Sequence, residues 1–388
     1  MQATDPQLDP HVVTTIVRQA THRDRLVLDA WRVEPVDYLN LNPAYRALYR
    51  VSGTAHDRGT PVPWSLILKT FKAPTADASD DPGQPFYWKR EPLAYQSGLL
   101  PTMAAGLAAP ASFGITERPD REIWLWLEDL GTADDSPWPL SRYGLAARHM
   151  GAFGGISAAH HPDTSVPWLS RGMIKAWIAD SESLIERVQR PGVWEHSLLR
   201  AAFPTPPAEE IVRLWNEHDR LCAALERLPG TLCHHDLWRK NVFSRQTADG
   251  HEQTVAIDWE VAGWGALGED VGNLFGVSLL NFDVEVDQAV ELEALIFHEY
   301  LAGLREAGWD GDVQAVRAAF VTAAALRCIF STACWPVAIT LDTSNRYIAE
   351  TEARWKRPIE QIFRQWAAVT RLLLSRADEA RTLLRDLV

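Results

Sequence analysis

Two polar clusters in the second half of the chain constrain its fold more than any other feature of the sequence. Residues 234–241 read H-H-D-L-W-R-K-N, and Asp258 follows Asn241 seventeen positions later. Between the clusters, short apolar runs at residues 242–243 and 254–257 flank a polar stretch, which is the pattern of a β-hairpin. A hairpin brings its two ends back together, so the sequence predicts that Asn241 and Asp258 lie side by side.

The spacing H-x-D-x-x-x-x-N, followed by a later Asp, matches the needs of phosphoryl transfer. That reaction requires one carboxylate to orient a hydroxyl and accept its proton, and an amide and a second carboxylate to hold the magnesium ion that bridges the phosphates. Taken singly, Asp236, Asn241 and Asp258 also fit a turn cap, a loop contact and a strand end. Their occurrence together at this spacing favours the catalytic interpretation.

The motif resembles that of the aminoglycoside phosphotransferase and choline kinase-like small-molecule kinases, and the resemblance extends from about residue 29 to about residue 280. In that family the motif usually reads H-G-D-x-x-x-x-N, followed by a hydrophobic run that ends in I-D-W or I-D-F. By position, Asp236 resembles the catalytic base, and His234 resembles the histidine that braces the catalytic loop. Asn241 and Asp258 resemble the magnesium ligands. The resemblance therefore implies ATP and Mg2+ as cofactors.

The chain departs from the family pattern inside the motif. His235 replaces the usual glycine, and Trp238 occupies a place often held by histidine. Neither change removes a required group, but both reshape the floor of the substrate cleft. Further along, Asp270 follows a glycine-rich turn and resembles the family's aspartate that supports the catalytic loop, so we expect it to act as scaffold.

The resemblance also implies a two-lobed protein-kinase-like fold of the α+β class. We expect a small antiparallel-sheet N-terminal lobe at residues 1–130, and a larger, mostly helical C-terminal lobe with the catalytic loop, the metal site and the acceptor cleft at residues 131–388. Helical periodicity downstream agrees with this division. The predicted helical stretches are residues 145–159, 174–190, 211–228, 290–307, 313–333 and 345–387.

A single lysine in an apolar strand is the candidate for contacting the phosphates. Residues 64–71 form a compact apolar run interrupted only by Lys69, where a snorkelling or edge role is the alternative. By resemblance, Lys69 contacts the α- and β-phosphates and needs a carboxylate partner, for which Glu91 is the best candidate. Pro92 restricts the residue before it, so Glu91 is predicted at the very start of its helix.

Two further segments are candidates for nucleotide binding. Residues 39–46 connect two predicted strands without any glycine, and Tyr45 and Arg46 would lie near the phosphates if this loop covers them; an ordinary hairpin is the alternative. Residues 124–131 form an apolar strand that runs into an acidic turn, the natural hinge between the lobes. The resemblance implies that backbone groups near Glu128, Asp129 and Leu130 hold the adenine.

Composition narrows the class of protein. A chain of 388 residues with 46% apolar content exceeds the usual size of a single core, so two lobes are expected. The formal charge of −13 argues against a nucleic-acid partner. We find neither signal-peptide features at the amino terminus nor an uninterrupted apolar run of membrane-spanning length, so a cytoplasmic protein without a membrane partner is expected. The four cysteines show no metal-ligand spacing and are expected to be core residues.

Acidic residues suggest the charge of the acceptor. Glu260 follows Asp258 closely, while Asp342, Glu350 and Glu352 lie in the carboxy-terminal region where the family builds its acceptor cleft. Each could equally be a solvated surface carboxylate. Several of them in one cleft would favour a hydroxylated acceptor that carries an amine, such as an amino sugar, an amino alcohol or an aminoglycoside.

Tryptophan is unusually frequent, with seventeen in the chain, and most are expected to be core. Trp238, Trp259 and Trp264 lie near the motif and are also candidates for stacking on a sugar or a cation. The sequence thus predicts an ATP-dependent kinase that phosphorylates a hydroxyl of a small molecule. A catalytically inert nucleotide-binding regulatory protein of the same fold is the alternative, which the glycine-free loop and His235 favour.

Overall fold

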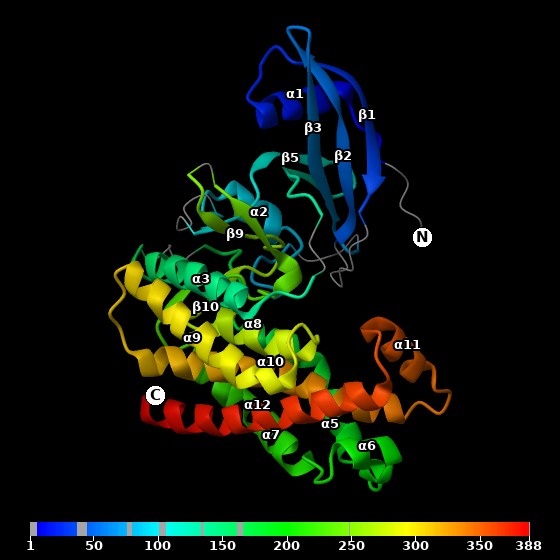
Figure 1. Ribbon diagram of the computed structural model, residues 1–388, viewed down its shortest axis with the longest axis vertical. Helices are drawn as coiled ribbons and strands as arrows, with labels where there is room; N and C mark the ends of the chain where they lie inside the picture. Colours follow the sequence, from blue (N-terminus) through cyan, green and yellow to red (C-terminus); the bar gives the residue numbers. More distant parts are fainter. Residues whose placement is uncertain are drawn as a thin grey trace.

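The computed structural model describes residues 6–36, 45–75, 80–100, 106–132, 136–160, 166–247 and 249–387. It has two lobes: a five-stranded antiparallel sheet with helices packed beside it, and a larger helical body (Figure 1). This architecture confirms the predicted α+β fold class with a sheet-containing N-terminal lobe and a helical C-terminal lobe. The exact division at residue 130 stays a prediction.

The N-terminal sheet runs in the order β1-β2-β3-β6-β5. Its strands are β1 (Val27–Pro35), β2 (Tyr45–Asp57), β3 (Thr60–Lys72), β5 (Ser112–Arg118) and β6 (Glu122–Glu128). Successive side chains of a strand point to opposite faces. On β3, Leu66 and Leu68 therefore face a small core that helix α1 (Pro10–Thr21) completes, while Lys69 and Phe71 face the other way, toward α2 (Arg90–Gln96) and the C-terminal lobe.

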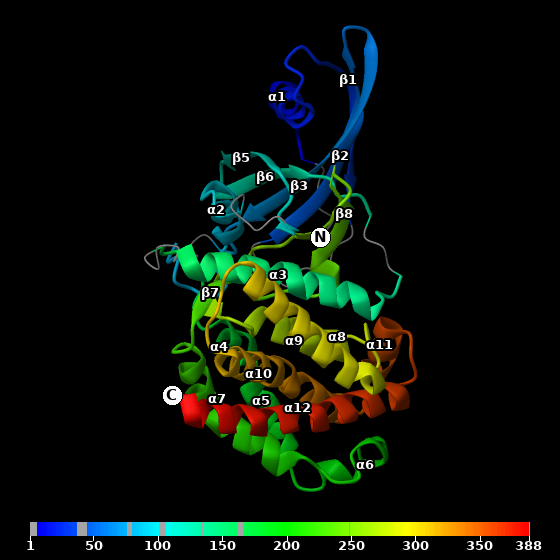
Figure 2. The same cartoon turned by 60° about the vertical axis from the view of Figure 1, so that its left-hand side comes forward.

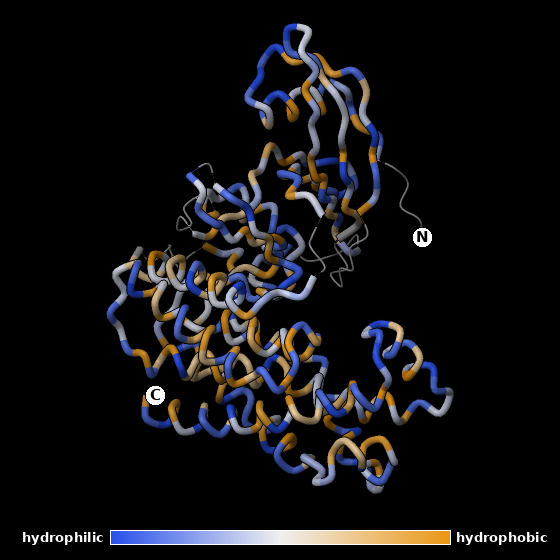
Figure 3. The backbone as a smooth tube through the Cα atoms, in the orientation of Figure 1, coloured by the Kyte–Doolittle hydropathy of each residue, from blue (hydrophilic) through white to orange (hydrophobic). Residues whose placement is uncertain are grey.

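The C-terminal lobe is built around three long helices. α10 (Val313–Thr340) packs against α8 (Glu269–Leu280) and α12 (Ile359–Leu387). Hydrophobic and hydrophilic residues alternate along the outer helices (Figure 3), so α12 buries one side against α10 and leaves the other in solvent. The remaining helices are α4 (Met173–Ile178), α5 (Glu182–Val188), α6 (Ser197–Ala202), α7 (Ala208–Leu225) and α11 (Arg346–Trp355).

Helices α3 (Leu140–His160) and α9 (Ala289–Glu306) lie side by side in both views (Figures 1 and 2). Glycines permit the close approach, because a Cβ added to Gly151 would lie 2.1 Å from the Tyr300 carbonyl oxygen, and one added to Gly303 would lie 1.9 Å from that of Arg148. Of this pair, α3 also contacts residues 230–233 and 252–256, which lie on either side of the motif in the chain.

The structure differs from the helix predictions in two places. The predicted helix 345–387 is split into α11 and α12, because Lys356 adopts a left-handed backbone and Pro358 follows it. The predicted helix 174–190 is likewise two helices, α4 and α5, joined by a single 3₁₀ turn. By length and composition α10 could span a membrane, but 78% of its most apolar window is buried inside the protein.

The predicted hairpin around the motif is confirmed. β7 (Gly230–Cys233) leads into the motif. β8 (Val242–Gln246) begins directly after Asn241 and pairs antiparallel with β9 (Glu252–Ala256), which ends two residues before Asp258. The hairpin lies between the sheet of the N-terminal lobe and α3 (Figure 2). β4 (Leu107–Ala108) pairs parallel with β9, and β10 (Gly263–Ala266) pairs antiparallel with β7. The Ile257 amide donates to the Asn241 carbonyl at 2.9 Å, so the two clusters converge.

Candidate active site

The loop between β7 and β8 presents Asp236 beside Asn241. The Asn241 side-chain amide donates to the Asp236 carboxylate at 3.1 Å and to its backbone carbonyl at 3.0 Å. Because Nδ2 makes these bonds, Oδ1 is the amide atom that would act as a metal ligand. The Asp236 carboxylate is about one quarter exposed, so it is within reach of a small molecule.

His234 braces this loop through both of its ring nitrogens. Its Nε2 lies 2.8 Å from the Ile257 carbonyl, and its Nδ1 lies 3.3 Å from the Asp236 backbone amide. A carbonyl accepts and an amide donates, so the ring carries its proton on Nε2. The ring also packs on buried Trp259, with 4.5 Å between centroids. His234 therefore ties the loop of Asp236 to the segment that carries Asp258.

Asp270 holds the loop from beneath. Its two carboxylate oxygens accept hydrogen bonds from the His234 amide at 2.8 Å and the His235 amide at 2.7 Å. Burial raises the pKa of Asp270, and the neighbouring histidines and these amides act in the opposite direction. The side chain makes the contacts expected of a scaffold residue at the start of α8.

His235 adopts a left-handed backbone with φ of 62°, a conformation that glycine adopts most easily. Its ring points inward, where Nδ1 lies 3.2 Å from a Glu269 carboxylate oxygen. Burial lowers the pKa of His235, but Glu269 and Asp270 more than offset this, so the pKa is raised above its usual value. The left-handed geometry explains why a glycine is usual here, and the ion pair accounts for the histidine.

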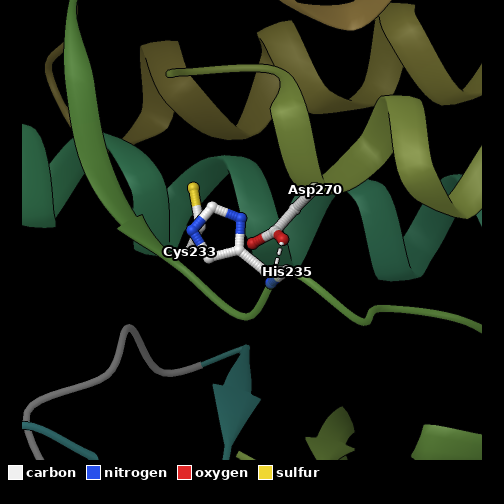
Figure 4. A group of neighbouring side chains, drawn as sticks. All are labelled: Cys233, His235 and Asp270. Carbon is white, nitrogen blue, oxygen red and sulfur yellow. Dashed lines mark hydrogen bonds between the residues drawn. The ribbon is translucent and has the colours of Figure 1, made fainter. Parts of the chain in front are cut away.

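Cys233, His235 and Asp270 lie close enough to be considered as metal ligands (Figure 4), with one ligand atom of each within 4.8 Å of the others. The Asp270 oxygens already accept two backbone amides, and burial raises the pKa of the Cys233 thiol well above its usual value, which favours the protonated form. A metal ligand must be deprotonated, and Mg2+ selects oxygen rather than sulfur. This trio therefore does not fit magnesium.

Lys69 lies between two carboxylates where the lobes meet. Its Nζ is 2.5 Å from Glu91 and 2.6 Å from Asp258, and all three side chains are buried. Burial lowers the pKa of Lys69, but the charges of Asp258 and Glu91 outweigh this effect, so the pKa of Lys69 is raised. Burial raises the pKa of Glu91 to about 7, although the charge of Lys69 acts in the opposite direction. Asp258 has a left-handed backbone with φ of 65°, which aims its carboxylate at the lysine.

Glu91 reaches Lys69 from the first turn of α2, as its position beside Pro92 predicts. A proline in a first helical turn removes no helical hydrogen bond, because the first amides of a helix lack partners within it. The preceding residue, Arg90, is completely buried and donates to backbone carbonyls of several segments, including Trp168 and Gln84. Arg90 thereby fixes the helix that positions Glu91.

The hinge follows β6. The Glu128 carboxylate pairs with Arg245 at 2.6 Å, and Asp129 pairs with Arg50 at 2.8 Å and accepts from the Ser65 hydroxyl. Both acidic side chains are thus engaged by protein groups, which leaves backbone atoms around Leu130 as candidates for contacting a base. The loop residues 39–44 and the side chains of residues 45 and 46 lie outside the described part, so the predicted roles of Tyr45 and Arg46 stay predictions.

The structure gives the local contacts of several predicted acceptor residues. Within the described residues, Asp342 makes its hydrogen bonds inside its own turn, to residues 344 and 347, and Glu350 pairs with Arg346 on α11. Their predicted role in acceptor binding stays a prediction. Trp264 packs on Gly230, at the end of β7 remote from Asp236, and Trp259 is fully buried.

Two predicted acceptor residues do lie beside the motif. The Glu260 backbone carbonyl accepts from Arg90 at 3.3 Å, and the Glu260 carboxylate raises the pKa of Lys69. Trp238 is half-buried within the motif, with the Lys240 ammonium 5.9 Å from its ring centroid.

Sequence reasoning missed Arg327, which reaches the catalytic loop from α10. Its Nη2 lies 3.5 Å from Asp236 Oδ1, and its guanidinium stacks on Trp177 at 4.1 Å from the ring centroid. A signal was present, because an arginine inside a long apolar helix is costly unless it has a partner.

Comparison with known proteins supports the motif assignment. Residues 187–311 match the model of the Phosphotransferase enzyme family, which confirms the resemblance over the segment that carries the motif. No curated protein gives a significant match to the chain.

Among solved structures, the chain is similar to an amicoumacin kinase in complex with AMP-PNP, Ca2+ and Ami (15% identity, TM-score 0.48, 91% of this chain and 94% of that one). It is similar to an aminoglycoside phosphotransferase from Alicyclobacillus acidocaldarius (13% identity, TM-score 0.49, 98% of this chain and 98% of that one). It is also similar to a Plasmodium vivax ethanolamine kinase (14% identity, TM-score 0.42, 84% of this chain and 81% of that one).

Proposed function

We propose that the chain is an ATP-dependent small-molecule kinase that transfers the γ-phosphoryl group of MgATP to a hydroxyl of a small polar acceptor. The observation that carries this proposal is the convergence of Asp236, Asn241, Asp258 and Lys69 where the two lobes meet. Phosphoryl transfer depends on positioning and charge stabilisation rather than on many reactive groups, and this set supplies both. The family match over the motif supports the same conclusion.

In this proposal Asp236 is the general base. Its carboxylate is partly exposed, is oriented by the Asn241 amide, and stands on a loop that Asp270 and His234 fix. A fixed carboxylate aligns the acceptor hydroxyl and receives its proton as the new O–P bond forms. His234 does not touch the acceptor and acts by positioning the loop.

Asp258 and Asn241 would hold the magnesium ion, since carboxylate and amide oxygens are the ligands it prefers. When bound, magnesium neutralises phosphate charge. Lys69 bonds to Asp258 in the structure described, and the phosphates of a bound nucleotide would offer it a second set of anionic partners. Glu91 would keep Lys69 positioned from the N-terminal lobe if Asp258 bound magnesium.

The rest of the assignment concerns the adenine, the acceptor and the compartment. Backbone groups at Glu128, Asp129 and Leu130 would hold the base, because both acidic side chains there are engaged by arginines. The amine on the acceptor stays a prediction, and Glu260, two residues after Asp258, remains a candidate to pair with it. Cytoplasmic location stays part of the proposal.

The test is acceptor-dependent formation of ADP from MgATP. The protein is incubated with panels of sugars, amino sugars, amino alcohols, hydroxy acids and aminoglycosides, with Asp236→Asn as the matched control. The proposal predicts ADP formation with at least one class and its loss in the control. If MgATP binds but no class of hydroxyl compound produces ADP, the inert nucleotide-binding alternative is correct.

A further inference from the structure

Arg327 is a charged residue in an otherwise apolar part of α10. Its neighbours in sequence, Leu326 and Cys328, are fully buried, and its own side chain is 18% exposed. Burying a guanidinium is costly unless hydrogen bonds and opposite charges compensate it. The partners of Arg327 therefore show what this position is built to bind.

Those partners are incomplete within the protein. The guanidinium lies over the ring of Trp177, but the nearest carboxylate oxygen among the described residues, on Asp236, is 3.5 Å away, and in this part of the chain the buried Nε has no hydrogen-bond partner. Arg317, another half-buried arginine on α10, differs in this respect. Its guanidinium lies 2.6 Å from a carboxylate oxygen of Glu293 and 2.6 Å from one of Glu379. Arg327 is thus held in place with part of its hydrogen-bonding capacity unused.

Arg327 and Asn241 contact different oxygens of the proposed base. The Asn241 amide donates to Oδ2 of Asp236, whereas Arg327 faces Oδ1, so the arginine and the proposed metal ligand address different oxygens of one carboxylate. Trp177 also meets Phe86 edge to face, and Phe86 is 41% exposed. The guanidinium therefore belongs to an aromatic-lined surface next to the base.

The other charges around Arg327 are already balanced. A cavity of about 10 Å3, enough for one water, lies behind it and is lined by His235, Glu269, Asp270 and Asn273. Glu269 pairs with His235 and accepts the Ala266 amide, and Asp270 accepts two backbone amides. With these carboxylates engaged, the guanidinium is the charge that a molecule bound beside Asp236 would meet.

We propose that Arg327 binds an anionic group, a carboxylate or a phosphate, of the acceptor. The chain would then select acceptors in which such a group stands near the reacting hydroxyl. This inference rests on the proposed function, since it takes Asp236 as the residue that receives the hydroxyl. An oxyanion beside Nη2 would accept a charge-assisted hydrogen bond from the guanidinium, whereas an ammonium group at the same place would be repelled. It therefore opposes the amine-bearing acceptor that the sequence suggested.

The first test compares acceptors that share a three-carbon skeleton: 3-hydroxypropanoate, 3-hydroxypropanamide and 3-aminopropan-1-ol, with glycerol 3-phosphate and glycerol as a second pair. The anionic members should be favoured by about tenfold or more in kcat/KM, as expected for a charge-assisted hydrogen bond. Arg327→Gln should raise KM for the anionic acceptors while changing KM for the neutral ones little, and Arg327→Lys should recover part of the loss. Preference for the amine would overturn the proposal.

Two controls separate this role from others. Arg118 also stacks on a tryptophan, with its guanidinium 4.5 Å from the Trp124 ring centroid, but it belongs to the exposed strand β5, so Arg118→Gln should behave as wild type. Affinity for MgAMP-PNP should be the same in wild type and Arg327→Gln. If Arg327→Gln weakens nucleotide binding and leaves acceptor KM unchanged, the arginine serves the nucleotide phosphates and the proposal is wrong.

The second test needs no catalysis, so its outcome is independent of the proposed function. Inorganic phosphate and 3-hydroxypropanoate are titrated calorimetrically into the protein saturated with MgAMP-PNP, which occupies the positions of all three nucleotide phosphates. Wild type should bind at least one of these anions, and Arg327→Gln should bind it about tenfold or more weakly. Absence of binding to wild type, or equal binding to both proteins, would refute an anion site at Arg327.

Discussion

Replacing Arg90 by methionine should destabilise the protein strongly although no catalytic group is removed. Arg90 is completely buried and donates to the carbonyls of Pro85 at 2.5 Å, Gln84 at 2.6 Å and Trp168 at 2.7 Å, with longer contacts to Pro82 and Glu260. Burial lowers its pKa to about 10, so it stays charged at neutral pH. Methionine fills similar space but leaves these carbonyls without a donor.

Hydrogen bonds from a charged group contribute about 1.5–3 kcal/mol each, but losing the charge also removes its own desolvation cost. Arg90→Met should therefore lower the free energy of unfolding by roughly 3–5 kcal/mol, the range seen when one partner of a buried charged contact is deleted. That is a large part of a total stability of about 5–15 kcal/mol. Urea denaturation monitored by tryptophan fluorescence measures this difference in the free energy of unfolding between wild type and Arg90→Met.

The adjacent half-exposed residue provides the control, since Lys89→Met should remain near wild-type stability. Arg90→Lys should have an intermediate free energy of unfolding, because an ammonium cannot reproduce the planar set of N–H donors of a guanidinium. MgATP affinity should fall in Arg90→Met, since α2 also carries Glu91. A loss below about 1 kcal/mol would refute the view that Arg90 anchors α2.

Other substitutions separate the remaining roles. Lys69→Ala should weaken MgATP binding while leaving adenosine binding nearly unchanged, because the lysine ammonium would contact the phosphates and not the adenine base. Equal losses of affinity for both ligands would contradict this role. Glu91→Gln keeps the volume but should lower turnover by releasing Lys69, and unchanged turnover would mean that the lysine has another functional partner. Asp258→Ala should reduce nucleotide affinity in magnesium to the magnesium-free value, which calorimetry tests directly. For His235, burial lowers the pKa but Glu269 and Asp270 raise it further, so the stabilisation it provides is complete below its unfolded pKa of about 6.5 and is lost as pH rises through the higher folded value. The difference in unfolding free energy between wild type and His235→Gln should therefore shrink as the pH rises above about 6.5, and a constant difference would exclude this linkage.

The parts of the site that the sequence predicted are those encoded locally. The hairpin between Asn241 and Asp258 follows from apolar runs around a polar turn, and the actual strands β8 and β9 match it. Lys69 was identifiable because it is the one charged residue in an apolar stretch, and Glu91 because it precedes a proline at a helix start.

The parts that escaped prediction depend on contacts between distant segments. Arg90 reaches the Glu260 carbonyl across 170 positions, and no local pattern indicates such a partner. Trp264 was placed near the site on sequence proximity, but β10 pairs with β7 so that its ring packs at the far end. Asp342 and Glu350 were grouped by charge, whereas their bonding is local to one turn and one helix. Arg327 was overlooked because periodicity assigned its helix to the core.

The central claim is that Asp236 is the base of a phosphoryl transfer from MgATP to a hydroxyl. Its most direct test is transfer of label from γ-labelled ATP to an acceptor by wild type and by Asp236→Asn, with MgATP affinity measured for both. The account predicts labelled acceptor with wild type, unchanged MgATP affinity in the variant, and transfer slower by about 10²- to 10⁴-fold. Near-normal transfer by Asp236→Asn would contradict it.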